Sequence, residues 1–169
     1  FRVGTAVLSN GNLNNLAYSI ELSRNSAGPS LIFPTYGSKF SIGAKLTFPY
    51  SLVNNKDYTE PAGLSDSERS AFLADKYKWM EYYKVSFKGE WYTAFTEKLV
   101  LMMNAQGGFL GHYNNKVGAT PFERFFVGGD GLAAYQLDGR ETIGLRGYEN
   151  NQLSSLEGGT IYNKFQLEL

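Results

Sequence analysis

The sequence predicts an all-β fold, and its pattern favours a transmembrane antiparallel β-barrel over a soluble sandwich of two sheets. Three observations support this prediction. Apolar side chains alternate with small or polar ones in several segments, which is typical of strands with one apolar face. Aromatic residues gather near the ends of these segments, and long connections alternate with short ones. Both features are typical of outer-membrane barrels.

The alternation predicts five strands and the end of a sixth. In residues 38–48, the apolar side chains Phe40, Ile42 and Leu46 stand at alternate positions. The same period is present in residues 16–23, 84–91, 98–109 and 161–169, and residues 1–7 resemble the end of a further strand. The chain starts and stops inside strand patterns, and an open sheet cannot remain in lipid. We therefore expect it to be an internal piece of a longer protein that closes the barrel.

The polar face of these strands bears on the choice between barrel and sandwich. In a sandwich the outer face meets water and is usually dense in Lys, Glu and Thr. Here it mixes Gly43, Asn104, Gln106 and Tyr162 with a few charged residues. A wet, crowded barrel lumen suits such a face. Because alternation is a weak signal for each strand, the soluble sandwich stays open as the alternative.

Composition excludes several classes of function. Lys plus Arg and Asp plus Glu both number 16, so there is no electrostatic case for a nucleic-acid partner. Cysteine is absent, which excludes disulfides and thiolate metal sites. No apolar run approaches the roughly 18 to 20 residues of a spanning helix, so any membrane insertion must use strands. The only histidine, His112, has no nucleophile or ligand cluster beside it. We therefore expect no catalytic residue, metal site or cofactor, and a protein that is not an enzyme.

The connections differ in length in a regular way. Long loops are predicted at about residues 51–80 and 111–159, and a short turn at residues 92–97. Barrels of this kind place long loops outside the cell and short turns in the periplasm. Within the first loop, Ser65 as N-cap and Glu68 as the third helical residue predict a capping box and a short helix over residues 65–76. Its simplest role is a solvated cover of the loop, although an extracellular helix could also bind a partner.

The second loop carries two motifs rich in glycine and aromatic residues. Residues 121–129 read Pro-Phe-Glu-Arg-Phe-Phe-Val-Gly-Gly, and residues 145–148 read Leu-Arg-Gly-Tyr. Such a segment is a poor solvent linker and predicts a packed plug that points Arg146 at a partner. A lone Arg-Gly pair could also be an exposed loop arginine beside a turn glycine. Gly128 and Gly129 are expected to supply positive φ for a turn, to allow close packing, or both.

Together with two further segments, these motifs resemble the BamA family of outer-membrane-protein assembly factors. The further segments are Phe33-Pro34-Thr35-Tyr36-Gly37-Ser38 and Glu81-Tyr82-Tyr83-Lys84-Val85. The resemblance spans most of the chain, and the order and spacing match the eighth to twelfth strands of the family's sixteen-stranded barrel, after the tail of the seventh. It implies that residues 1–169 are a fragment of a C-terminal outer-membrane barrel domain. Residues 130–143 are an insertion relative to the shortest family pattern.

The resemblance also implies a lock between loop and wall. In the family, the Arg-Gly-aromatic loop folds back into the lumen, and its arginine meets acidic residues on the inner wall. The matching pair here is Arg146 and Glu168, and alternation independently places Glu168 on the polar face. A second acid is expected beyond Leu169. The motif-loop residues that accompany Arg146 are Leu145, Gly147, Tyr148, Phe125, Phe126, Gly128 and Gly129.

The function implied by the resemblance is the assembly and insertion of β-barrel proteins into the bacterial outer membrane. The chain would be the barrel part of the core subunit of the BAM complex. Its implied partners are client outer-membrane β-barrel proteins, BAM-complex lipoproteins and the lipid bilayer of the outer membrane. Two alternatives remain. A two-partner-type secretion transporter has the same barrel, and some relatives fuse a hydrolase to it, although His112 alone provides no hydrolase machinery.

Overall fold

The computed structural model describes residues 2–3, 6–7, 12–30, 32–54, 56–130, 141–150 and 152–169. The chain divides into two compact units. The strand unit comprises Ser19–Lys45, Lys84–Phe109 and Ile161–Leu169, and contains the greater part of each long strand. The loop unit comprises Phe1–Tyr18, Leu46–Tyr83 and Leu110–Thr160.

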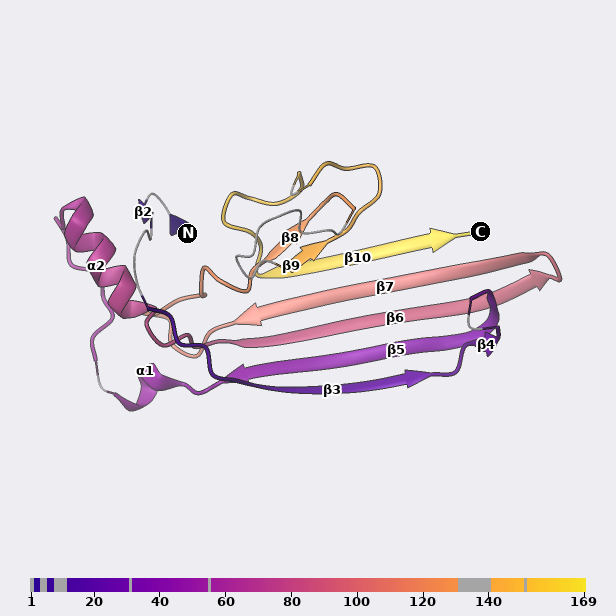
Figure 1. Cartoon of the computed structure of the whole chain (residues 1–169), viewed down its shortest axis with the longest axis horizontal. Helices are drawn as coiled ribbons and strands as arrows, with labels where there is room; N and C mark the ends of the chain where they lie inside the picture. The colour runs from indigo at the N-terminus through magenta and orange to yellow at the C-terminus, as the bar shows by residue number, and fades with distance from the viewer. Residues whose placement is uncertain are drawn as a thin grey trace. The chain divides into compact units, whose positions relative to one another are not determined.

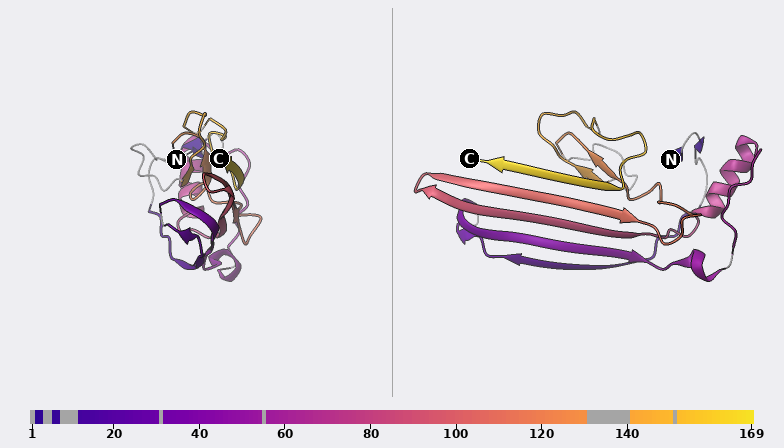
Figure 2. Two further views of the ribbon diagram at one scale, coloured as in Figure 1. Left: turned by 90° about the vertical axis from the view of Figure 1, so that its right-hand side faces the viewer. Right: turned by 180° about the vertical axis from the view of Figure 1, so that it is seen from behind.

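Five long strands form one antiparallel sheet, as the alternation predicts. They are β3 (Ala17–Asn25), β5 (Pro34–Thr47), β6 (Tyr83–Thr96), β7 (Leu99–Gly111) and β10 (Ile161–Glu168). Their order is β10-β7-β6-β5-β3, so each long strand lies beside the next one in the sequence. Figure 1 shows their alternating directions, and Figure 2 shows the same order from behind. The short strand β4 (Gly28–Pro29) pairs with β5. Within the described residues this is an open sheet, part of a β-barrel without its closure.

The apolar face of this sheet is the more exposed face. In β5, Phe40 and Ile42 expose 39% and 45% of their surfaces, whereas Lys39 beside them is half-buried. In the central strand β6, Trp91 exposes 39% while its neighbour Glu90 is half-buried. Large apolar surface of this extent is unfavourable in water. The pattern is the reverse of that of a soluble sandwich and fits a sheet whose apolar side chains meet lipid.

The ladder between β7 and β10 is regular. Eight consecutive residue pairs run from Ile161 opposite Phe109 to Glu168 opposite Met102. Glu168 lies on the same face as Gln166, whose side-chain amide donates a hydrogen bond to the Glu168 carboxylate. One residue beyond the ladder, the Leu110 N–H donates to the Thr160 carbonyl oxygen at 2.7 Å. This last bond joins the two ends of the second long loop.

Two predictions about the ends of elements are wrong. The turn predicted at residues 92–97 is instead the two residues Glu97 and Lys98, because β6 continues to Thr96. β-branched and aromatic residues near that end favour the extended chain. The described residues of segment 1–7 form two short strands and not the end of one long strand. The strands β1 (Arg2–Val3) and β2 (Ala6–Val7) pair with each other. So short an alternation does not determine which partner a strand takes.

The first long loop contains two helices, of which one is predicted. α2 (Asp66–Lys76) begins after Ser65, and the capping box with Glu68 is present. Leu73 anchors the helix, with only 3% of its surface exposed. The short α1 (Tyr50–Val53) is not predicted from the sequence. It is fixed by the buried Glu81 carboxylate, which accepts the Ser51 backbone N–H at 2.8 Å and the Ser51 hydroxyl at 2.5 Å.

Helices capable of crossing a bilayer are absent from the described residues, because neither α1 nor α2 is long and apolar enough.

The capping box of α2 predicts a change in the titration of Glu68. Hydrogen bonds from the Ser65 hydroxyl and the Ser65 backbone N–H lower the pKa of the Glu68 carboxyl. Because the folded-state pKa is depressed, the contribution of this cap is present above the unfolded-state pKa and is lost as pH falls through the folded-state value. We expect Ser65→Ala to raise the pKa of Glu68 and to speed amide exchange in the first turn. A carboxyl NMR titration measures the first effect, with Ser70→Ala as the control inside the helix.

Candidate functional site in the motif loop

The second long loop contains a small sheet. β8 (Phe125–Val127) and β9 (Glu141–Ile143) are parallel and pair over their full length. On its other edge β8 meets Gly159, with Phe125 and Gly159 exchanging N–H to carbonyl bonds of 2.9 and 2.8 Å. Figure 1 shows β8 and β9 side by side. The sequence predicts a packed segment here but no strands, because three-residue strands show no measurable period.

Aromatic side chains of the first motif form the core of this loop. Phe125 exposes 1% of its surface, Phe126 5% and Phe122 7%. The Phe126 ring lies so close to Gly158 that a Cβ there would stand 2.7 Å from a ring atom, and the φ of Gly158 is +77°. The packed plug predicted for this loop is therefore packed within its own unit. Phe125 and Phe126, two predicted site residues, serve as its centre.

The second motif is a β-turn with Arg146 at its tip. The Tyr148 N–H donates to the Leu145 carbonyl oxygen at 3.4 Å across residues 145–148. Gly147, at the third position, has φ +90°. Positive φ at that position is the requirement of a type II turn, which explains the glycine. Arg146 occupies the second position and is exposed.

The two motifs are bonded to each other through Gly129. Its N–H donates to the Tyr148 carbonyl oxygen at 3.0 Å, and its own carbonyl oxygen accepts the Leu145 N–H at 2.8 Å. The preceding Gly128 N–H donates to the Ile143 carbonyl oxygen at 3.0 Å. One residue thus holds both ends of the arginine turn. We call the pairing of Gly129 with Leu145 and Tyr148 the glycine clamp.

Gly129 serves both purposes that the sequence left open. Its φ is +76°, and a Cβ at this position would lie 1.6 Å from Oδ1 of Asn150 and 3.0 Å from the Asn150 Cα. A side chain is therefore excluded by backbone conformation and by space. Gly128 also has a positive φ, +132°.

Another arginine of this loop, Arg124, is half-buried. Its Nε donates to the Thr120 carbonyl oxygen at 3.0 Å, and its Nη1 lies 3.2 Å from the Glu157 carboxylate. The Arg124 side chain exposes 15% of its surface and that of Glu157 36%. The pair ties the beginning of the loop to its end. Sequence reasoning missed Arg124 as a site residue, although a cation within an aromatic run must find buried partners.

Glu123 adds a strained contact at the same place. It is the one residue other than glycine with positive φ in the described part of the chain, at +63°. Its carboxylate accepts the hydroxyl of the fully buried Tyr82 at 3.2 Å. Strain of this kind persists where the surrounding structure imposes it. Here it fixes the first motif against the segment that leads into β6.

The predicted lock joins residues of different units. Arg146 lies in the loop unit and Glu168 in the strand unit, so their contact stays a prediction. Residues 131–140, most of the predicted insertion, lie outside the described residues. His112 Nε2 is 3.0 Å from Oδ1 of Asn115. In the described ranges, no three His, Asp or Glu side chains are grouped to hold a metal ion.

Comparison with known proteins gives one match. The family model of the Omp85 superfamily domain matches residues 4–169. Neither a curated protein nor a solved structure matches the chain significantly.

The glycine clamp predicts a specific cost for Gly129→Ala. An L-residue at this φ costs roughly 1 to 2 kcal/mol, and the new methyl group also displaces Asn150. We expect faster hydrogen exchange at the Leu145 amide, which donates its hydrogen bond to the Gly129 carbonyl oxygen. Gly118→Ala is the matched control, because Gly118 has φ +74° and a Cβ added there would meet nothing within 4 Å. Equal effects of the two substitutions on the Leu145 amide would contradict the clamp.

Arg124 predicts a loss of stability together with a change in titration. Breaking a buried ion pair costs roughly 3 to 5 kcal/mol of folding free energy. Because Glu157 is partly exposed, we expect the loss in Arg124→Gln to lie at the lower end of that range. Native-state exchange at the Phe125 amide measures this loss. Burial raises the pKa of Tyr77, and the positive charge of Arg124 opposes that rise. The pKa of Tyr77 should therefore rise further in Arg124→Gln and change little in Arg124→Lys, which keeps the charge. NMR of labelled tyrosine, with Tyr77→Phe for assignment, checks this.

Proposed function

Because this chain belongs to the Omp85 superfamily, we propose that it acts in the assembly and insertion of β-barrel proteins into the bacterial outer membrane. This superfamily of outer-membrane β-barrel proteins includes insertases and secretion transporters. In this proposal the chain forms part of the barrel wall, together with the motif loop, of a BamA-type subunit at the core of the BAM complex. The observation that carries it is the glycine clamp, which fixes an Arg-Gly-aromatic turn in one orientation.

The proposed activity needs no cofactor. A client strand cannot enter lipid with unpaired backbone groups, so it must pair as it inserts. A barrel that opens laterally offers a strand edge for that pairing and thins the nearby bilayer. The opening would lie between the first and last strands of the whole barrel. The wall formed here would stay closed, and the uninterrupted β7–β10 ladder supports that role.

The proposed partners follow from the same mechanism. Client outer-membrane β-barrel proteins would supply the strands, and the outer-membrane bilayer would receive them. BAM-complex lipoproteins would bind the core subunit. Because the exposed face of the sheet is apolar, lipid is the partner that the described residues contact most extensively in this proposal.

In this proposal Arg146 and Glu168 form the lock that fixes the loop. A guanidinium on a carboxylate gives charge-assisted bonds that are roughly twice as strong as neutral ones. The β-turn places Arg146 at a tip held at both ends, so little backbone freedom remains to be lost when it binds. Glu168 accepts an amide hydrogen bond from Gln166, which orients the carboxylate on the polar face.

The test is assembly by the purified protein in lipid vesicles. Wild type should speed folding of an added, unfolded client barrel, measured by gel mobility without heating. We expect Arg146→Ala and Glu168→Gln each to slow assembly about tenfold, and the double variant to be no slower than either, since coupled residues are non-additive. Arg146→Lys, which keeps charge but loses the fork, should fall between.

Two outcomes would overturn the proposal. A normal rate of client assembly in Arg146→Ala would contradict the proposed lock between Arg146 and Glu168. Export of an unfolded, non-barrel polypeptide across the vesicle, without acceleration of client folding, would identify a two-partner-type secretion transporter instead.

A further inference from the structure

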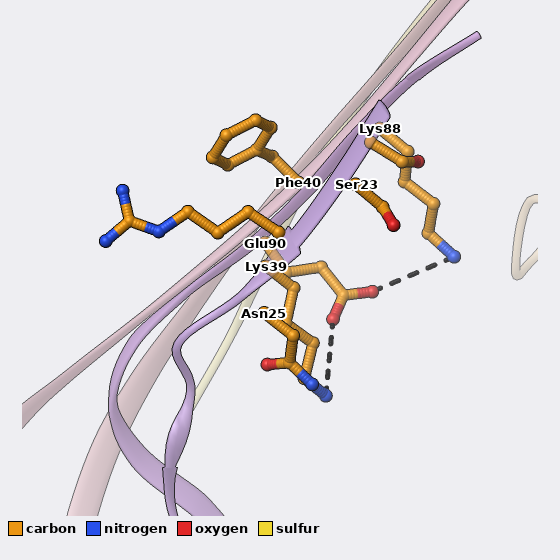
Figure 3. Close-up of a pocket in the computed structure, with 8 residues that line it drawn as sticks. Ser23, Asn25, Lys39, Phe40, Lys88 and Glu90 are labelled. Carbon is orange, nitrogen blue, oxygen red and sulfur yellow. Dashed lines mark ion pairs between the residues drawn. The ribbon is translucent and has the colours of Figure 1, made fainter. Parts of the chain in front are cut away.

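An open pocket of about 230 Å³ lies on the strand unit, away from the motif loop in sequence. It is formed where β3, β5 and β6 lie side by side. Its polar lining includes Ser23, Asn25, Lys39, Ser41, Lys88 and Glu90. Figure 3 shows Lys39 and Lys88 both directed at Glu90, while Phe40 points the other way. The pocket therefore opens on the polar face of the sheet.

Donors outnumber acceptors in this lining. Lys39 and Lys88 lie 3.9 and 3.8 Å from the carboxylate oxygens of Glu90. These distances exceed the 2.7 to 2.9 Å or so of a charge-assisted hydrogen bond. Glu90 instead accepts the Tyr92 hydroxyl at 3.0 Å. The two ammonium groups thus attract Glu90 electrostatically but donate no hydrogen bond to it.

Neighbouring groups add to the excess. Ser23 and Ser41 contribute hydroxyls that can donate. The side-chain oxygen of Asn25 already accepts the Ala27 N–H at 3.1 Å, so its NH₂ is the part of the amide left for a ligand. Two lysines against one carboxylate give the polar lining a net positive charge. A ligand that satisfies this set is an anion with oxygen acceptors.

We propose that the pocket binds acidic side chains of an extended polypeptide. The apolar face of the sheet is the one that meets lipid, so lipid headgroups are on the wrong side. Glu90 would repel a phosphate dianion more strongly than it repels a single carboxylate. The pocket is open, which allows a polypeptide to pass along the wall. One of its carboxylates can then replace Glu90 as the partner of Lys39 and Lys88. That the ligand is a polypeptide rests on the proposed function.

The experiment compares two peptides on the protein reconstituted in vesicles. They share one sequence, with Glu and Asp in one and Gln and Asn in the other, and binding is followed by fluorescence anisotropy. We expect about tenfold tighter binding of the acidic peptide, as charge-assisted hydrogen bonds allow. The double substitution Lys39→Gln and Lys88→Gln should abolish the preference. Lys39→Arg with Lys88→Arg should retain it. The matched control, Lys78→Gln with Lys98→Gln, removes the same charge elsewhere and should keep the preference.

Glu90→Gln provides the decisive readout. If Glu90 competes with the ligand for the lysines, removing its charge should raise the affinity for the acidic peptide about threefold or more. A purely structural ion-pair cluster would instead be weakened by the same change. Equal affinity for both peptides in wild type, or a preference that survives Lys39→Gln with Lys88→Gln, would overturn the proposal. So would displacement of the acidic peptide by inorganic phosphate at concentrations that leave sulfate without effect.

The assembly assay separates this inference from the proposed function. Wild type that speeds client folding but shows no peptide preference would refute the pocket alone. Wild type that prefers the acidic peptide but does not speed folding would refute the assembly role and keep the pocket.

Discussion

Backbone pairing between neighbouring strands is the constraint on which the rest of this structure depends. The apolar side of the sheet is exposed, and lipid offers no hydrogen bonds to the N–H and C=O groups between those side chains. Every backbone group in the wall must therefore be satisfied along the strands. In β5 and β6, the charged residues Lys39, Lys88 and Glu90 lie on the other face. The inverted distribution of polarity follows from the solvent that the outer face meets, with the same strand geometry as in soluble proteins.

The loop unit uses a different means of organisation. The segments of its motif loop are too short for periodic patterns, and the order of that loop comes from single backbone bonds made by residues with unusual conformations. Gly129 joins two motifs, Gly158 admits an aromatic ring, and Glu123 accepts strain to reach a buried tyrosine. Arg124 supplies the charged bond across the base. None of these residues stands at the tip of the arginine turn, so the contacts that order the loop are separate from the side chain proposed to bind a partner.

The contrast between local and long-range contacts explains what the sequence could predict. Strands such as β5 and the capped start of α2 depend on neighbours within a few residues, so alternation and the Ser65–Glu68 spacing were sufficient. The bond from Gly129 to Leu145 spans many residues without periodicity and left no local signal. α1 depends on Glu81, which lies far along the chain. Arg124 was missed because the motifs show which residue types are present. They do not show that Arg124 is more buried than Arg146.

The hydrogen bond between Leu110 and Thr160 has a consequence for variation in this protein. Since β7 and β10 already pair beside that bond, the ends of the motif loop are brought together by the wall and not by the loop itself. The entropy of closing a loop grows slowly with its length, by about 0.6 kcal/mol for each doubling. Extra residues between the two motifs therefore add little to the free energy of closure. Length can change there during evolution, or by insertion of a label, while the glycine clamp and the wall keep their own geometry.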